Sequence, residues 1–512
     1  MLHAATLGEL LRRAAQTAPT TDAFRYRDER LTYADWDRLA DRFAAGLAAR
    51  GVRAGEVVAL LLPSTPLYLL AYLGAARLGA VTTGINIRYR RVEIGHILRR
   101  AQPRWLLAVD EWHGADFRRI VEPGDAGIDW FAADDLRRSS AAVVESFAAA
   151  APPAEAMVAP DSPVAIVFTS GTTGVPKGAW YTHRNLLALA DIDTRRYASG
   201  TPPFQKHFMA GLSFAHIGMM ARIGLQLGHL GTSIIHDTFD PATVLATIEA
   251  ERLPHLGGIP TQIIMLLDHP DRARHDLSSL RSVLLGGAPA APELIQRIQR
   301  ELGVAVSVRY SSTEVGIGTA SLEDDPPAIL ATTVGKPTAG VELRVVDEHE
   351  QPRPAGEVGH VHIRSAAMMR GYWNDPEQTT ATITPDGWIR TGDLGRLDDA
   401  GYLHLRGRES EMFIRGGFNV YPAEIEDVLA RHPKVGRAAV LGVPDSTFGE
   451  IGWAFVVPRH PSDPPALAEL RTHVGGELAS FKRPDGLTIV AELPITPMFK
   501  VDKRALRDVP RA

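Results

Sequence analysis

The sequence directly after the apolar run Val164–Phe168 reads Thr169-Ser-Gly-Thr-Thr-Gly-Val-Pro-Lys-Gly178. A short apolar run ahead of a glycine-rich turn is typical of a buried strand that ends at a loop. The glycines let backbone N–H groups approach an anion, the hydroxyl side chains add donors, and Lys177 adds a positive charge. The spacing differs from the P-loop of nucleoside triphosphatases. We predict a phosphate-binding loop here, with a plain surface turn as the alternative.

Upstream of this loop, helical and strand patterns alternate. The apolar run Val57–Leu62 ends at Pro63, a helical pattern follows from Leu67 to Leu78, and another strand begins at Ala80. An earlier helical pattern precedes Gly51, where a left-handed helix end is expected, and consists of Trp36, Leu39, Ala40, Phe43 and Leu47. This order predicts β-α-β units, and therefore a parallel sheet with helical crossovers.

Downstream, the pattern changes twice. Another short run, Val283–Leu285, precedes Gly286-Gly287, and the alternation over 332–363 predicts an antiparallel or barrel-like part. Residues 401–410 are dense in charge and glycine, which favours a linker. We therefore predict an α/β protein with a large N-terminal domain, 1–408, of parallel and mixed sheets with helices plus the barrel-like part. A small, mobile α+β domain, 409–512, follows it.

Composition narrows the class of protein. The chain has 512 residues, 45% hydrophobic and 22% charged, with a formal net charge of -5, so no basic surface for nucleic acid is expected. It contains no cysteine, which excludes disulfides, thiolate nucleophiles and cysteine metal sites. Neither a signal peptide nor a membrane-spanning run is evident. We expect a cytoplasmic protein.

Further segments that carry reactive side chains follow in order along the chain. They are Tyr310-Ser-Ser-Thr-Glu314, Arg390-Thr-Gly-Asp-Leu394, Gly407-Arg408 with Gly416-Gly-Phe-Asn-Val-Tyr-Pro-Ala-Glu-Ile-Glu426, and Lys500. Together with the 169–178 loop, they resemble the motifs of the adenylate-forming superfamily, which contains acyl-CoA synthetases, luciferases and peptide-synthetase adenylation domains. The resemblance spans about residues 25–506.

The resemblance implies a role for each motif. Lys500 would bridge the acyl carboxylate and the α-phosphate of ATP, Glu314 would hold Mg²⁺, and Thr313 would contact a phosphate oxygen. Asp393 would accept hydrogen bonds from the ribose, supported by Arg408. The remaining nucleotide- or CoA-binding residues would be Thr169, Ser170, Gly171, Thr172, Thr173, Gly174, Lys177, Gly287, Ala288, Pro289, Tyr310, Ser311, Gly416 and Gly417. Such a set is chemically reasonable, because a carboxylate attacking a phosphate needs cations and oriented donors around both anions.

The region around His216 indicates which kind of carboxylic acid could bind. His216 resembles a motif that lines the acyl and pantetheine channel. No acidic residue lies between Met209 and Leu227, so an amino-acid ammonium would lack a counter-charge there. With Met219 and Met220 in this run, we expect an apolar pocket wall.

Some positions depart from the family pattern. Ser311 replaces a glycine and, with Arg309, could narrow or polarise the acyl pocket. Ser410 stands at the hinge position where Asp or Lys is usual, and Phe499 precedes Lys500 in place of glycine. None of these changes removes a catalytic group.

We therefore expect an AMP-forming acyl-CoA synthetase. It would convert an apolar carboxylic acid and Mg·ATP into an acyl-adenylate and pyrophosphate, and then transfer the acyl group to CoA. One alternative keeps the adenylate but uses a carrier-protein thiol, an amine or an unusual acid. Another is a catalytically silent nucleotide-binding relative. The oligomeric state stays open, with a homodimer as one option.

Overall fold

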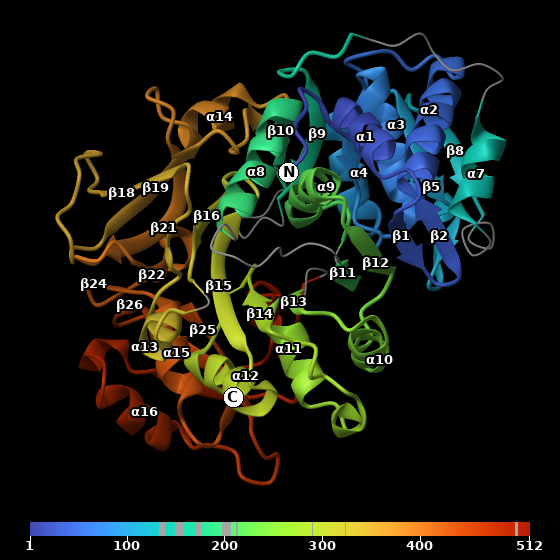
Figure 1. Ribbon diagram of the computed structural model, residues 1–512. Coiled ribbons are helices and arrows are strands. Elements are labelled where there is room, and N and C mark those ends of the chain that lie inside the picture. Colours follow the sequence, from blue (N-terminus) through green and yellow to red (C-terminus); the bar gives the residue numbers. More distant parts are fainter. Residues whose placement is uncertain are drawn as a thin grey trace.

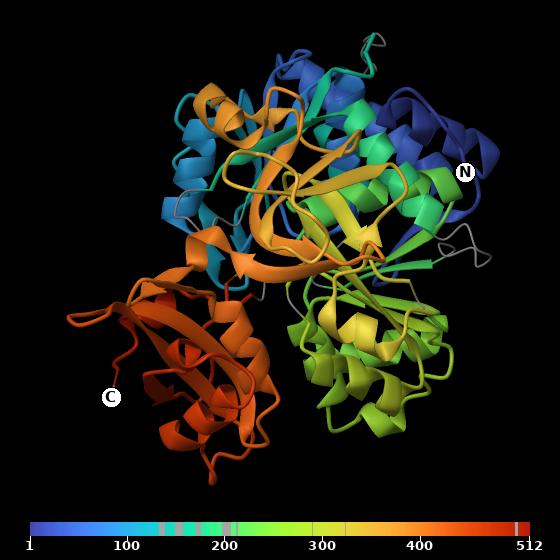
Figure 2. The same ribbon diagram turned by 90° about the vertical axis from the view of Figure 1, so that its left-hand side faces the viewer.

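A computed structural model describes residues 1–132, 139–148, 157–169, 176–196, 206–210, 213–288, 290–322, 324–496 and 500–511. Figures 1 and 2 show a large N-terminal part and, below it, a small separate body formed by the C-terminal residues. The predicted α/β class, with a large and a small domain, is confirmed. Within the described ranges, every helix is too short or too polar to cross a membrane.

The central sheet contains the strand that precedes the glycine-rich loop and the strands predicted upstream of it. Its order is β20 (Gly371–Tyr372), β10 (Gly178–Thr182), β9 (Pro163–Phe168), β4 (Val81–Gly84), β3 (Val57–Leu61), β5 (Trp105–Val109) and β8 (Gly127–Phe131). β3 runs parallel to both β4 and β5, and all five of its residues are buried, which explains its uninterrupted apolar sequence. Only β10 and β20 at one edge are antiparallel to their neighbours. The predicted β-α-β unit is therefore present.

Helices and a second sheet surround this centre. α3 begins with Pro66 at its first position and ends at the left-handed Gly79, and Gly51 likewise has a positive φ of 80° after α2. The nearby helices are α1 (Leu7–Thr17), α2 (Tyr33–Ala49), α3 (Pro66–Leu78), α4 (Arg91–Ala101), α5 (Phe117–Ile120), α7 (Ser140–Phe147), α8 (His183–Arg196) and α9 (Ile217–His229). The second sheet has the order β11 (Lys206–Ala210), β12 (Thr232–His236), β1 (Asp22–Tyr26) and β2 (Glu29–Thr32), and a hairpin joins β6 (Glu111–Trp112) to β7 (Ala115–Asp116).

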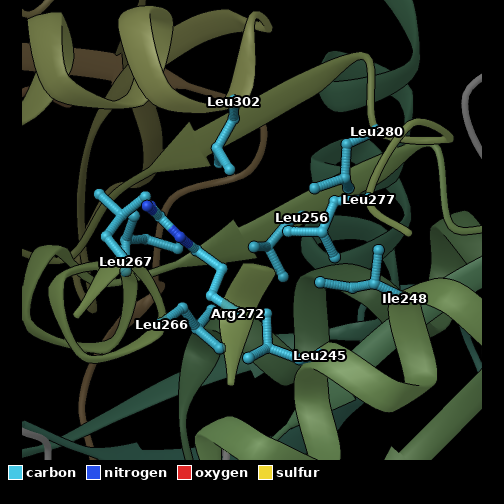
Figure 3. A pocket seen from close by; sticks show the side chains of 10 residues that line it. Leu245, Ile248, Leu256, Leu266, Leu267, Arg272, Leu277, Leu280 and Leu302 are labelled. Atoms are coloured by element: carbon cyan, nitrogen blue, oxygen red, sulfur yellow. The ribbon is translucent and has the colours of Figure 1, made fainter. Parts of the chain in front are cut away.

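A third sheet supplies several of the predicted site residues. Its order is β13 (His255–Gly258), β14 (Ser282–Leu285), β15 (Ala305–Ser312), β16 (Gly316–Ala320) and β17 (Lys336–Pro337), with β13, β14 and β15 parallel. Its helices are α10 (Pro241–Glu251), α11 (Pro260–Leu267), α12 (Pro292–Leu302) and α13 (Pro327–Thr332), with η1 (Arg272–Arg274). Figure 3 shows a pocket within this unit, where the Arg272 side chain extends between leucines. Arg272 donates to Glu301 at 2.5 Å, so this pocket is a gap in the core spanned by an ion pair.

The alternating region forms an antiparallel sheet, as predicted. Its order is β18 (Val341–Val346), β19 (Gly359–Ser365), β21 (Ile389–Leu397) and β22 (Leu403–Arg408), with α14 (Pro376–Thr382) beside it. The prediction of a linker over 401–410 is wrong for most of its length. Residues 403–408 pair with β21, and their charged side chains lie on a strand whose other positions are partly buried. Only the short η2 (Glu409–Glu411) follows β22 before the next sheet.

The C-terminal body has its own sheet and cores. The strands are β24 (Phe418–Val420), β23 (Phe413–Arg415), β26 (Gly449–Pro458) and β25 (Val435–Asp445), and β27 (Gly486–Ile489) pairs with β26. The remaining elements are α15 (Pro422–Ala430), α16 (Leu467–Gly475), η3 (Ser480–Lys482) and η4 (Ala505–Asp508). Arg406 on β22 donates to Glu424 on α15 at 3.1 Å, which ties this body to the antiparallel sheet.

Candidate active site

The ends of the glycine-rich loop are held together at its base. The backbone N–H of Thr169 donates to the carbonyl of Lys177 at 2.9 Å, and the N–H of Lys177 donates to the Thr169 hydroxyl at 3.2 Å. The Lys177 ammonium donates to Gln378 Oε1 at 2.6 Å and lies 5.1 Å from the centre of the Tyr372 ring. Ser170, Gly171, Thr172, Thr173 and Gly174, which we also predicted as phosphate-binding, lie outside the described residues.

Thr313 and Glu314 lie in the turn between β15 and β16. The Tyr372 hydroxyl donates to Glu314 Oε1 at 2.9 Å, and the Glu314 carbonyl accepts from the N–H of Met369 at 2.9 Å. The Tyr181 hydroxyl donates to the Thr313 carbonyl. These contacts from β10 and β20 hold the turn at the edge of the central sheet that also carries the glycine-rich loop.

Asp393 and Arg408 face each other across β21 and β22. Arg408 Nε lies 3.1 Å from one carboxylate oxygen of Asp393, and the Tyr310 hydroxyl donates to the other. Burial raises the pKa of Asp393, although the Arg408 charge and the Tyr310 hydrogen bond act in the opposite direction. The strand pairing therefore brings together three residues that we predicted from separate motifs.

Lys500 reaches this group from the C-terminal body. Its backbone N–H donates to the Thr496 hydroxyl at 3.2 Å, beside a β-bridge between Ile495 and Val501. Burial lowers the pKa of the Lys500 ammonium, and the charge of Arg408 lowers it further, whereas Glu314 and Asp393 oppose that shift. The carboxylates and cations predicted from four motifs thus act on one another in the folded chain.

Lys503 holds the segment that carries Lys500. Its ammonium donates to Glu411 at 2.7 Å, and it lies 3.0 Å from Glu426. Glu411 belongs to η2, which directly follows β22, and Glu426 belongs to α15. The end of the chain is therefore bonded to the junction between the two domains.

His216 caps the N-terminus of α9. Its Nδ1 accepts a hydrogen bond from the N–H of Gly218 at 3.2 Å. Burial, assisted by the charge of Lys500, lowers the pKa of His216 to about 4, so its ring is neutral near pH 7. A small pocket adjoins it, lined by Gly84, Asn86, Tyr89, Phe168, Ser213, Ala215 and His216.

The other predicted residues divide into two groups. Gly287, with a φ of 79°, and Ala288 follow β14, and Ser311 is exposed on β15 next to Tyr310. Pro289 lies outside the described residues. Gly416 and Gly417 form the exposed turn between β23 and β24, where the N–H of Gly416 donates to the Phe448 carbonyl at 2.8 Å. The structure therefore does not bring this turn into the cluster around Lys500.

Sequence reasoning missed Tyr372, Gln378 and Tyr181. Each makes a hydrogen bond to a predicted residue, but none stands in a motif that we singled out. A signal for Tyr372 does exist, because Gly371-Tyr372-Trp373 is an aromatic pair after a glycine. This signal points to the site only once β20 pairs with β10, and the local sequence does not predict that pairing.

The donor set suits a nucleotide with its divalent cation better than a metal held by protein alone. Among the residues that the structure describes, no group of three His, Asp or Glu side chains could form a metal site. Mg²⁺ is commonly bound by one or two carboxylates together with phosphate oxygens and water. Glu314, which lies beside the base of the glycine-rich loop, fits that mode.

Comparisons with known proteins agree with this arrangement. The family model for AMP-binding enzymes matches residues 11–373, and the model for the C-terminal domain of AMP-binding enzymes matches residues 424–500. The chain belongs to the AMP-binding enzymes. Within that class it is an adenylate-forming enzyme of the acid–CoA ligase family.

Individual relatives match over nearly the whole chain. A Rhodococcus jostii ligase, named for joining CoA to a propanoyl group that carries a methyl-dioxo-octahydroindenyl ring, is 36% identical and covers 98% of both chains. A feruloyl-CoA synthase from an Amycolatopsis species is 35% identical, again with 98% of both chains covered. The crystal structure of ATP-bound MatB from Rhodopseudomonas palustris has a TM-score of 0.87 and 30% identity, with 98% of both chains covered. The nearly full-length matches to named CoA ligases favour an active enzyme over the alternative of a catalytically silent nucleotide-binding relative.

Proposed function

We propose that this enzyme activates a largely apolar carboxylic acid with Mg·ATP and transfers the acyl group to CoA. One observation carries the proposal. Lys500, from the small domain, lies where the charges of Glu314, Asp393 and Arg408, from the large domain, all shift its pKa. An ammonium whose pKa responds to two carboxylates and a guanidinium is suited to a reaction in which two anions must meet.

In the first step, a carboxylate oxygen of the acid attacks the α-phosphorus of ATP, and pyrophosphate leaves. Lys500 neutralises the attacking carboxylate and the α-phosphate. The ends of the glycine-rich loop, with Lys177, hold the departing phosphates. Glu314 would hold Mg²⁺ and Thr313 would contact a phosphate oxygen. The ion, when bound, would offset negative charge on the phosphates.

The nucleoside would be held by the group around Asp393. Its carboxylate accepts from the ribose hydroxyls, and Arg408 keeps that carboxylate oriented. Tyr310, Gly287 and Ala288 would enclose the adenine. Tyr310 already donates a hydrogen bond to Asp393, so the residue that would contact the adenine also holds the residue that would contact the ribose.

In the second step, the CoA thiolate attacks the acyl carbon and AMP leaves. We propose that the small domain turns about Ser410, withdraws Lys500 and brings Gly416 and Gly417 to the channel beside His216. Exposed apolar side chains around that turn support a second position, because a rotated domain would bury them. They are Ile414, Phe418 and Phe448, exposed by 49%, 55% and 42%.

The binding of the CoA phosphates stays without an assigned residue. Arg415 and Arg437 of the small domain are weak candidates for a positive patch that could bind them. Arg415 instead forms a two-point ion pair with Asp485, at 2.8 and 2.9 Å, so its charge is neutralised. Burial lowers the pKa of Arg437, which also argues against a solvent-facing phosphate site.

The decisive experiment measures pyrophosphate release over a panel of linear, branched, aryl and polycyclic acids, with and without CoA. We expect release with one class of apolar acid, stimulated by CoA, and acyl-CoA as the product. α-Amino acids should be poor substrates, because α9 and its flanks carry no acidic side chain between Met209 and Leu227. Adenylate that forms but does not react with CoA would instead favour a carrier-protein thiol or an amine as the acceptor.

A further inference from the structure

The two faces of the sheet β13–β14–β15 differ in polarity. One face packs apolar side chains into the core of this unit, including Val283, Leu285 and Val306. At the carboxyl ends of the strands, the other face carries the partly exposed Leu284 of β14 and a set of small or polar residues. They are Gly257 on β13, Gly286 directly after β14, and Arg309 and Ser311 on β15.

Charged side chains of helices α8 and α9 reach this face of the sheet. Arg309 pairs with Asp193 of α8 at 2.5 Å, and both side chains are largely buried. Arg222 extends from α9 to β13, where its Nη2 lies 2.8 Å from the point that a Cβ on Gly257 would occupy. The missing side chain of Gly257 therefore makes room for the guanidinium of Arg222.

Residues expected to form the apolar wall lie elsewhere. Met219 and Met220 are exposed by 0% and 2% and belong to the main core, so they face away from the polar surface. Arg222, on the same helix, is partly exposed. The apolar wall expected from the run between Met209 and Leu227 stays a prediction, but Met219 and Met220 pack into the core, and Arg222 of the same helix reaches the sheet.

The distance of Arg222 from the reacting centre follows from the helix. His216, whose pKa is lowered in part by the charge of Lys500, caps α9, and Arg222 lies six residues further along the chain. At 1.5 Å per residue, this separation is roughly 9 Å along the axis. Gly257, Leu284 and Gly286 are partly exposed and Ser311 is exposed, so solvent reaches this face of the sheet at these positions.

We propose that Arg222 recognises an oxygen-bearing group at the end of the acid remote from its reacting carboxylate. The substrate class is a carboxylic acid with a hydrocarbon middle and a distal carbonyl or carboxylate oxygen. A guanidinium donates hydrogen bonds and accepts none, so an oxygen acceptor suits it, whereas an alkyl end cannot accept a hydrogen bond. The Arg309–Asp193 pair supplies a second polar wall beside it. This inference rests on the proposed function, because it places the acid between Lys500 and β13.

The test compares acids that differ only at the far end. Pyrophosphate release is measured for an unbranched fatty acid, for its ω-oxo counterpart and for its ω-carboxy counterpart, across a series of chain lengths. We expect kcat/KM of the wild-type enzyme to be roughly 10- to 100-fold higher for an oxygen-bearing acid than for the hydrocarbon of equal length. The ω-oxo and ω-carboxy arms distinguish a neutral acceptor from a charged one.

Two variants test whether Arg222 is responsible. Arg222→Met should abolish the preference by lowering kcat/KM for the oxygen-bearing acid and raising it for the hydrocarbon acid. Gly257→Ala keeps the charge but displaces the guanidinium, so it should reduce the preference by a smaller factor. Arg300→Met, at an exposed arginine on α12 with a 68% exposed side chain, is the matched control and should keep the wild-type ratio.

The outcomes separate the two proposals. If no acid of any kind gives pyrophosphate release, the proposed function fails. If acids are activated but the wild-type enzyme prefers the hydrocarbon end, or if Arg222→Met keeps the wild-type ratio, the role of Arg222 is overturned. Thermal melting of each variant identifies a misfolded protein. If Arg222→Met is misfolded, the acid preference of Gly257→Ala decides whether Arg222 has this role, because that variant removes no charge.

Discussion

The two functional segments of the small domain differ in how fully they are covered. Lys500 and Lys503 are partly buried, and Lys503 contacts Glu411 and Glu426 of the small domain. The charges of Glu314 and Asp393, from the large domain, act on Lys500. The turn at Gly416 and Gly417, in contrast, is open to solvent and flanked by exposed Phe418. Under the proposed function, this difference corresponds to the arrangement for adenylate formation, with the segment proposed for thioester formation turned to solvent. The predictions below test that division of labour.

The largest effect is expected for Lys500→Ala. Loss of one oriented charge should slow adenylate formation by about 10²–10³-fold. Thioester formation from supplied acyl-adenylate should change much less, because the covered segment serves only the first step. The two half-reactions are measured separately, with Lys434→Ala as the control, at a partly exposed lysine that pairs with Asp463 and Glu469 outside the cluster. Equal loss in both half-reactions would mean that Lys500 has another role.

Ser410→Pro should have the opposite profile. Proline fixes φ near -65°, which the 3₁₀ turn of η2 tolerates, and it opposes other backbone states at Ser410 by about 3 kcal/mol. We expect transfer to CoA to fall about 10²-fold while adenylate formation persists. Ser410→Ala is the control. Wild-type transfer by the proline variant would place the pivot elsewhere.

The pH dependence of the first step sharpens the comparison. Because burial lowers the pKa of Lys500 and the protonated amine is the active form, activity should fall as pH rises through that lowered value. The midpoint should lie below the ordinary lysine value of ~10.4. Lys500→Arg keeps its charge at high pH, so any residual activity of this variant should lack that decline. A decline that is identical in both enzymes would have another origin.

The smallest effect is expected for Tyr372→Phe. This variant removes the hydroxyl that donates to Glu314 and should slow adenylate formation about threefold to tenfold, the usual worth of one hydrogen bond. Tyr402→Phe is a matched control, since its hydroxyl donates to Asp325 at 2.7 Å, outside the cluster. Equal effects of the two variants on the first step would deny Tyr372 a positioning role.

The fold was predictable where a short segment determines its own environment. The run Val57–Leu61 is apolar at every position and is buried at every position, and the loop after Phe168 has glycines where the chain must turn. The linker expected at 401–410 failed because charge density marks exposed side chains and not necessarily irregular backbone. A partly exposed strand such as β22 carries the same signal.

The site was predictable in its ionised residues but not in their supports. Glu314, Asp393, Arg408 and Lys500 stand in motifs whose order along the chain is informative. Tyr372 acquires its role only when β20 pairs with β10, which is a long-range contact. Arg222 was overlooked for a related reason, since its importance depends on the missing side chain of Gly257 on another element.

The contact between Arg222 and Gly257 has an evolutionary consequence. Neither residue belongs to the motifs that handle ATP, and they come from a helix and a strand at some distance along the chain from those motifs. A single substitution at either position would alter which acid fits without disturbing the adenylation chemistry. A lineage could therefore acquire new substrates by small mutational steps while its nucleotide site stayed under unchanged selection.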